Sequence, residues 1–98
     1  MLTEKEILTK HYGEYGNVER ARLRHADKNA WKEMLAVGTL DAYLTEFEDE
    51  KTEQFLDLTE QLAKNWNVTE ELKKKDPVEW MRQMNMVRMS VREMLTRG

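Results

Sequence analysis

The sequence predicts an all-α protein, a small helical bundle of about five helices. Apolar residues recur at steps of three and four along most of the chain, which is the spacing of one helix face. Only four glycines and one proline are present, so there are few places for the tight turns that join strands. At 98 residues the chain is long enough for one modest core, and we expect a single domain over 1–98.

The N-terminal part carries start and stop signals for short helices. Thr3 and Glu6 have the spacing of a capping box, which predicts a helix start. The glycines within 13–16 are expected to end this helix, so that 1–16 forms an N-terminal helical lead. Asn17 can cap a second helix that continues to about Ala26.

A third helix is expected from Asp27, as its cap, to Gly38, although the second and third helices could also form one bent helix. The next helix spans about 39–66, and its apolar stripe lapses near Lys51. That stripe is expected to contain Leu40, Tyr43, Leu44, Phe47, Phe55, Leu58, Leu62 and Trp66.

The C-terminal part predicts a short helical corner followed by a long helix. Residues 69–75 form the corner, and Asp76 caps a helix over 77–97 that has Pro77 at its first position. We expect this helix to pair antiparallel with the long helix over 39–66. Its predicted core stripe consists of Trp80, Met84, Val87, Val91, Met94 and Leu95.

The residue types give little basis for catalysis or for a cofactor. The chain has no cysteine, one serine and two histidines, and it lacks both a glycine-rich phosphate loop and an HExxH motif. We therefore expect no enzyme, no cofactor and no metal. One acidic cluster could hold a cation, but it is better interpreted as a solvated helix face: Glu46, Asp49, Glu50 and Glu53. The lack of a long apolar run and of cysteine leads us to expect a cytoplasmic protein.

Charge is distributed unevenly although the formal net charge is only −3. Residues 17–32 are net basic, 41–60 strongly acidic and 77–98 net basic again. The basic parts supply candidate nucleic-acid contacts, which could equally be plain surface: Arg20, Arg24, Lys28, Arg82, Asn85, Arg88 and Arg92. Residues 67–88 also resemble a helix-turn-helix loosely, but Glu79 would repel phosphate and Trp80 is better used in the core.

Met86 and Met89 project close to the side of the last helix opposite its core stripe. Methionine often fills irregular gaps in a core, so these two residues could simply be adaptable filler. An alternative is a partner interface, because two apolar side chains that point into water are a liability.

Three stretches, together with the spacing between them, resemble the small transposon-encoded TnpV-like proteins: "EYGNVERARLRHA", "MLAVGTLDAYL" and "NVTEELKKKDPVEWMRQMNMVR". The last stretch is the most specific, and it carries the following matching positions: Val68, Thr69, Glu70, Leu72, Lys73, Asp76, Trp80, Met84, Asn85 and Arg88. The resemblance covers about 14–95. The lead over 1–16 differs from the usual family pattern, and family members often extend beyond residue 98.

The resemblance implies an accessory role in a mobile genetic element, in the manner of excisionase-like factors that bind DNA. An alternative is a helical protein-binding module or inhibitor, in which the acidic stretch 41–60 faces a basic partner. A third interpretation is a homodimer formed through the long helices.

Overall fold

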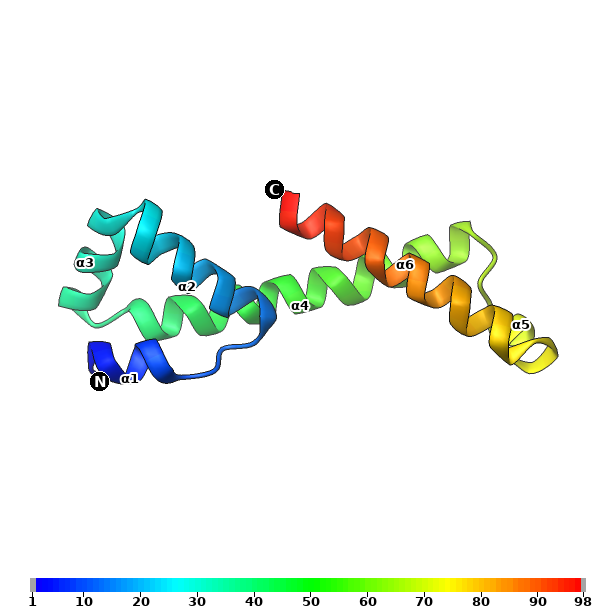
Figure 1. Cartoon of the computed structure of the whole chain (residues 1–98), viewed down its shortest axis with the longest axis horizontal. Coiled ribbons are helices and arrows are strands. Elements are labelled where there is room, and N and C mark those ends of the chain that lie inside the picture. The colour runs from blue at the N-terminus through cyan, green and yellow to red at the C-terminus, as the bar shows by residue number, and fades with distance from the viewer. Residues whose placement is uncertain (1, 98) are drawn as a thin grey trace. The chain divides into compact units, whose positions relative to one another are not determined.

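The computed structural model describes residues 2–97, and within this range it contains six helices and no strand, which confirms the all-α class (Figure 1). The helices are α1 (Glu4–Thr9), α2 (Glu14–Ala26), α3 (Lys28–Val37), α4 (Leu40–Asn65), α5 (Glu70–Lys75) and α6 (Pro77–Arg97). Contacts divide the chain into two compact units, one up to Thr52 and the other from Glu53 on. The boundary lies within α4, next to the lapse in its apolar stripe at Lys51.

In the first unit, α2 runs antiparallel to the first half of α4, and α3 joins them at one end (Figure 1). Leu23 of α2 packs with Leu40 and Leu44 of α4, and all three side chains are fully buried. Burial of each such side chain contributes about 1.5–3 kcal/mol. Helix α1 and α3 add Ile7 and Trp31 to the same core.

The N-cap of α2 is Gly13, four residues before the position that the sequence predicted. We expected Asn17 as its N-cap, but the helix starts at Glu14, and Asn17 instead accepts a hydrogen bond from the Tyr12 amide at 3.0 Å. The carboxylate of Glu48 caps the helix start instead, because it accepts hydrogen bonds from the backbone N–H of Tyr15 at 2.9 Å and of Gly16 at 3.4 Å. A carboxylate from α4, remote in sequence, therefore satisfies the first amides of α2.

Two glycines make room for this contact. Gly13 has φ 109°, a left-handed conformation that side chains rarely adopt, and a Cβ there would lie 2.2 Å from Glu48 Oε1. A Cβ on Gly16 would lie 3.2 Å from the carbonyl oxygen of Leu44. The glycines that we expected to end a helix therefore allow α2 and α4 to approach each other closely.

The other predicted caps of this unit are confirmed. Thr3 and Glu6 form the capping box of α1. Asp27 accepts from the Ala30 amide at 3.3 Å, and Gly38 ends α3 in the left-handed conformation. Because Asp27 separates Ala26 from Lys28, the second and third helices are distinct rather than one bent helix.

Two tyrosine–carboxylate pairs join α4 to α2 and to the loop between α1 and α2. The buried Glu19 accepts hydrogen bonds from the Tyr43 hydroxyl and from Arg22, whose Nη2 lies 2.8 Å from Oε2. Arg22 and then Tyr43 lower the pKa of Glu19 against the opposing effect of burial. In the second pair, Asp41 accepts from the Tyr12 hydroxyl at 2.6 Å and from Lys10 at 2.9 Å.

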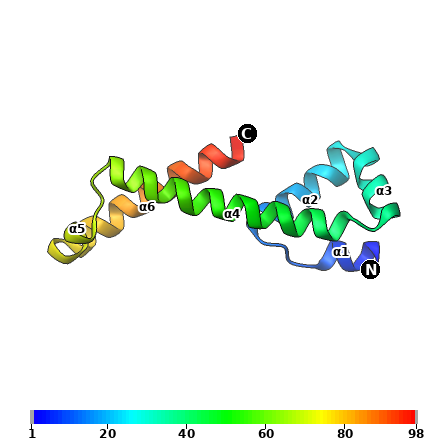
Figure 2. The same cartoon turned by 180° about the vertical axis from the view of Figure 1, so that it is seen from behind.

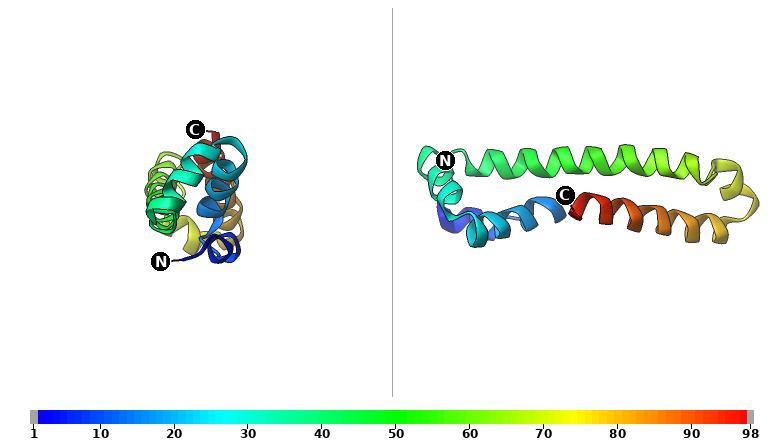
Figure 3. Two further views of the ribbon diagram at one scale, coloured as in Figure 1. Left: turned by 90° about the vertical axis from the view of Figure 1, so that its left-hand side faces the viewer. Right: turned by 90° about the horizontal axis from the view of Figure 1, so that it is seen from above.

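In the second unit, α6 runs back along the second half of α4, as predicted (Figure 3). Arg92, near the end of α6, lies 5.9 Å from the ring of Phe55, which lies early in this half of α4. The buried core consists of Ala63, Val68, Val87 and Val91, and it is flanked by Phe55, Leu58, Leu62, Leu72, Trp80, Met84 and Leu95.

Two residues assigned to apolar stripes are largely exposed. Met94 is 52% exposed because it lies at the margin of the stripe centred on Val87 and Val91. Trp66 is 43% exposed, and it lies just past the end of α4 at Asn65, where its backbone N–H still donates to the Leu62 carbonyl oxygen at 3.0 Å.

Short polar caps set the corner of this unit, where α5 lies beside the start of α6 (Figure 2). Thr69 accepts from the Leu72 amide at 3.3 Å, and Asp76 accepts from the Glu79 amide at 3.2 Å. Both starts agree with the sequence prediction. Within residues 2–97 the structure has no helix that is both long and apolar enough to cross a membrane.

Candidate nucleic-acid interface

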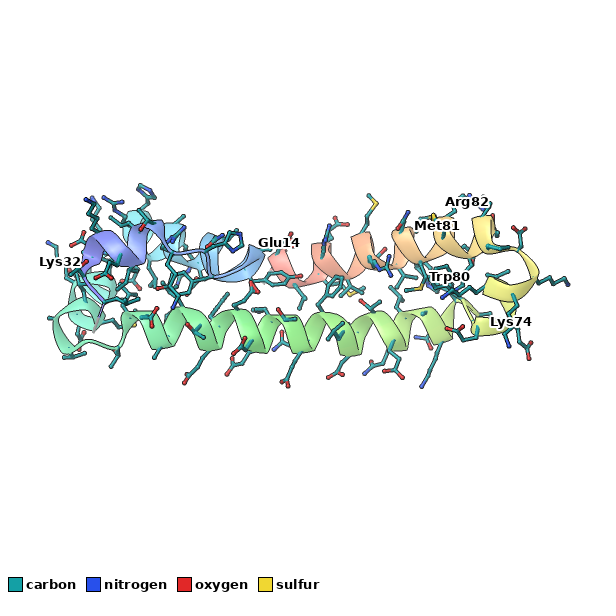
Figure 4. The ribbon with its side chains drawn as sticks, turned by 90° about the horizontal axis from the view of Figure 1, so that it is seen from below. Glu14, Lys32, Lys74, Trp80, Met81 and Arg82 are labelled. Atoms are coloured by element: carbon teal, nitrogen blue, oxygen red, sulfur yellow. The ribbon has the colours of Figure 1, made fainter. Side chains whose placement is uncertain are left out.

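The rotation of α6 is fixed by its core stripe, and this decides which side chains face solvent. Val87 and Val91 are fully buried against α4, so residues half a turn away point outward. In Figure 4, Trp80 lies between α6 and α4, whereas Met81 and Arg82 point away from α4. We call the exposed surface of α6 its outer face. It comprises Val78, Met81, Arg82, Asn85, Met86, Arg88, Met89 and, at its edge beside α4, Arg92.

Arg82, on the outer face, is held by an acidic side chain of its own helix. Its Nε and Nη2 donate to the two carboxylate oxygens of Glu79 at 3.0 and 2.6 Å, which is a bidentate pair. Gln83 Nε2 donates to the same carboxylate at 2.7 Å. Arg82 and then Gln83 lower the pKa of Glu79 to about 2, so the pair is fully ionised near neutral pH.

Asn85 and Arg88 are exposed, and the described part of the chain offers neither of them a hydrogen bond or an ion pair. Arg92 is exposed as well, but its guanidinium lies over the Phe55 ring. At spacings of three and four residues, these side chains share one stripe of α6. Of the four predicted contacts on this helix, Asn85, Arg88 and Arg92 share one flank, and Arg82 lies about a third of a turn from Arg88.

The predicted contacts in the first unit form no such stripe. Lys28 belongs to α3, so it does not continue the helix that carries Arg20 and Arg24. Arg20 is half-buried and donates to the carbonyl oxygens of Lys10 and, at 2.8 Å, of Ile7. Arg24 and Lys28 are exposed, but the guanidinium of Arg20 is used to bind the end of α1.

Sequence analysis overlooked the lysine run beside the start of α6. Lys73 lies 4.8 Å from the centroid of the Trp80 ring, and Lys74 and Lys75 are exposed. The run was visible in the sequence, but it was interpreted only as a helical corner. Because Asp76 alone separates α5 from α6, the link is shorter than the three or four residues of a helix-turn-helix.

The outer face is also apolar. Met86 and Met89, the predicted partner-interface residues, are 51% and 68% exposed. Val78 and Met81, which the sequence analysis did not assign to this interface, are 78% and 59% exposed. The outer face therefore carries four exposed apolar side chains, and exposed apolar surface on a helix can serve as a binding site.

The acidic cluster of α4 is exposed, as expected for a solvated helix face: Glu46, Asp49, Glu50 and Glu53. Among residues 2–97, no group of three or more histidine, aspartate or glutamate side chains is placed to hold a metal ion. Glu48, which lies between these residues in sequence, points inward and caps α2.

The fold and the outer face of α6 define a small all-α protein with one basic and apolar helix surface. The chain belongs to the family of the transposon-encoded protein TnpV, whose family model matches residues 1–98. The match includes the lead over 1–16, which the resemblance in the sequence had set apart. No curated protein and no solved structure matches the chain.

Proposed function

We propose that the chain is a non-enzymatic accessory protein of a mobile genetic element and that it binds duplex DNA through the outer face of α6. The transposon-encoded family supports the mobile-element context. The observation that carries the DNA proposal is the exposure of Asn85 and Arg88 on one flank of α6, where the described residues give neither side chain a hydrogen bond or an ion pair. Asparagine is suited to adenine edges, and an exposed arginine can contact phosphate as well as guanine.

The dimensions and charge of this surface suit the major groove of DNA. An α-helix fits that groove, and α6 is 21 residues long with its core stripe on the opposite side. Lys74 and Lys75 lie at the end of α5, next to the start of α6, where they can contact phosphate. Arg24 and Lys28 are further phosphate contacts that we propose for the first unit, whereas Arg20 is not included because it binds α1.

An electrophoretic shift assay with the ends of the element and a nonspecific duplex tests the proposal. The double variant Arg88→Ala, Arg92→Ala removes two cations from the outer face. We expect its affinity for DNA to fall at least about tenfold. The slope of the logarithm of the binding constant against the logarithm of the salt concentration should become less steep by about 2. The charge-matched control Lys5→Ala, Lys32→Ala alters exposed residues of α1 and α3 and is expected to bind as the unsubstituted chain does.

Either of two results would contradict DNA binding by this face. One is the absence of any shift at low salt with every duplex. The other is an equal loss of affinity in the two double variants, since that would mean that only net charge matters.

A second candidate function is a protein-binding module, and it is favoured by the exposed acids of α4 together with Met86 and Met89. The acidic stretch 41–60 would face a basic partner, and the methionines would supply apolar contact. A defined host protein that the chain retains, and that the variant Glu46→Lys, Glu53→Lys loses, would support this function.

The partner of such a protein-binding module could also be a second copy of the chain, which would make a homodimer. Sedimentation velocity over rising concentration would reveal a dimer, which Met86→Lys, Met89→Lys should dissociate. A monomer mass throughout would reject self-association.

A further inference from the structure

The guanidinium of Arg82 is held along one edge and open along the other. Its Nε and one N–H of Nη2 are used by the Glu79 carboxylate, at 3.0 and 2.6 Å. Of the five N–H donors of an arginine, those on the Nη1–Nη2 edge remain, and they form two parallel donors. The Arg82 side chain is 66% exposed, so this edge is accessible to a ligand.

The carboxylate that holds Arg82 is itself fixed in place. Glu79 Oε1 also accepts from Gln83 Nε2 at 2.7 Å, and the Glu79 side chain is only 30% exposed. The backbone N–H of Glu79 is bound by Asp76 Oδ1, which anchors the first turn of α6. Arg82 is therefore oriented before any ligand arrives, which lowers the entropy cost of binding.

The chemistry of this pair favours a neutral acceptor over a phosphate. Glu79 and Arg82 together have no net charge, and the carboxylate would repel a phosphate placed close to it. The open edge still supplies two directional donors, which match a pair of neighbouring acceptor atoms. Guanine presents such a pair, O6 and N7, in the major groove.

The surroundings of Arg82 also suit the floor of a groove. Val78 and Met86 lie four residues before and four residues after Arg82, on the same side of α6, and are 78% and 51% exposed. Apolar side chains at these positions can contact the methyl group of thymine. Arg82 belongs to the first two turns of α6, the part of a recognition helix that touches base edges.

We propose that Arg82, oriented by Glu79, is a specificity-determining residue that reads a guanine in the major groove. This inference rests on the proposed DNA-binding function. In it, Arg82 contacts the base, Glu79 is a positioning residue, and Arg88 and Arg92 supply affinity that is independent of sequence.

Selection from a randomised duplex library, followed by sequencing, tests the assignment with the full chain. We expect the unsubstituted chain to enrich guanine at one fixed position, with at least about a fivefold affinity advantage over the other bases. Arg82→Lys keeps the charge but lacks the planar guanidinium. The ratio of the affinity for the guanine site to the affinity for a site with another base there should therefore fall to about one. The control Arg88→Ala should weaken binding to all sequences by the same factor and leave the ratio unchanged.

Two further measurements separate base reading from a structural role. Replacing the selected guanine by 7-deazaguanine removes N7, and it should weaken the unsubstituted chain several-fold while leaving the Arg82→Lys variant insensitive. Glu79→Gln should reduce the guanine preference without loss of helicity, because it removes the charge that orients Arg82 and leaves the capping amide in place.

The outcomes distinguish this inference from the proposed function. Salt-sensitive DNA binding without a guanine preference, or a preference that Arg82→Lys retains, would overturn the role of Arg82 and leave DNA binding standing. If no duplex binds at all, both proposals fail. Preferential binding of an acidic protein through Arg82 would also overturn the inference and would favour the protein-binding module.

Discussion

Replacement of Glu48 tests the contact that determines where α2 begins. In Glu48→Ala, the N–H groups of Tyr15 and Gly16 lose their acceptor, which lies at 2.9 and 3.4 Å, and the Thr52 hydroxyl loses a partner at 3.1 Å. Loss of a helix cap costs about 1 kcal/mol, and loss of a negative charge at a helix N-terminus costs about 0.3–1 kcal/mol more. We therefore expect the free energy of unfolding to fall by about 1.3–2 kcal/mol.

Urea unfolding followed by far-UV circular dichroism measures this loss. Glu46→Ala is the matched control, because it removes an exposed carboxylate from the same helix, and it should change stability by less than about 0.5 kcal/mol. Amide hydrogen exchange supplies a local measurement. The Tyr15 and Gly16 amides should exchange about tenfold faster in Glu48→Ala, as expected if the free energy of local opening falls by about 1.4 kcal/mol.

The substitution Glu48→Gln refines the interpretation. The amide side chain keeps an acceptor oxygen but loses the charge, so we expect roughly half of the destabilisation. If Glu48→Ala and Glu46→Ala unfold at the same urea concentration, and the Tyr15 and Gly16 amides exchange at unchanged rates, the capping role of Glu48 is wrong.

Two other substitutions test the first unit. Arg20→Ala removes two hydrogen bonds to the end of α1 and should lower stability by about 1–2 kcal/mol in urea unfolding; an unchanged midpoint would mean that Arg20 is free to bind a ligand instead. The folded-state pKa of Glu19 lies below its ordinary value of 4.5, so its contribution to stability is present above about pH 4.5 and is lost as the pH falls further. The decrease in the free energy of unfolding from pH 7 to pH 3 should therefore be smaller in Glu19→Gln than in the unsubstituted chain. An equal decrease in the two proteins would contradict this role of Glu19.

Local signals in the sequence were sufficient to locate most helix ends. The capping box at Thr3, the cap at Asp27, the left-handed Gly38 and the Asp76-Pro77 start all agree with the structure. Each of these signals acts through residues within four positions along the chain, so no knowledge of the tertiary structure is needed to interpret it.

The errors arose where the deciding partner is remote in sequence. Asn17 looked like a helix cap, but Glu48, more than thirty residues away, supplies the acceptor that starts α2 earlier. Arg20 looked like a surface cation for the same reason, because its acceptors belong to another helix. Met94 was placed in the core from helical periodicity, which does not show where the neighbouring helix stops covering a face.

The candidate interface could be predicted in part. Helical projection correctly placed Met86 and Met89 on the exposed side of α6, and it placed Asn85, Arg88 and Arg92 on one flank. It treated Glu79 only as a helix-start signal that would repel phosphate. The structure shows in addition that Glu79 forms a bidentate pair with Arg82, which orients the guanidinium of that arginine.

The sequence by itself determined the all-α class, the long helices, the family and the charged stretches, because all of these follow from residue types and their spacing along the chain. Only the tertiary structure decided which charged side chains are free and which are used internally. Ion pairs and caps depend on distances of about 3 Å between side chains, and those distances are set when α2 packs on α4 and α6 packs on α4. For this reason Arg20 and Arg88, which the sequence marks alike as candidate nucleic-acid contacts, differ in the folded protein. Arg20 binds the end of α1, and Arg88 is exposed.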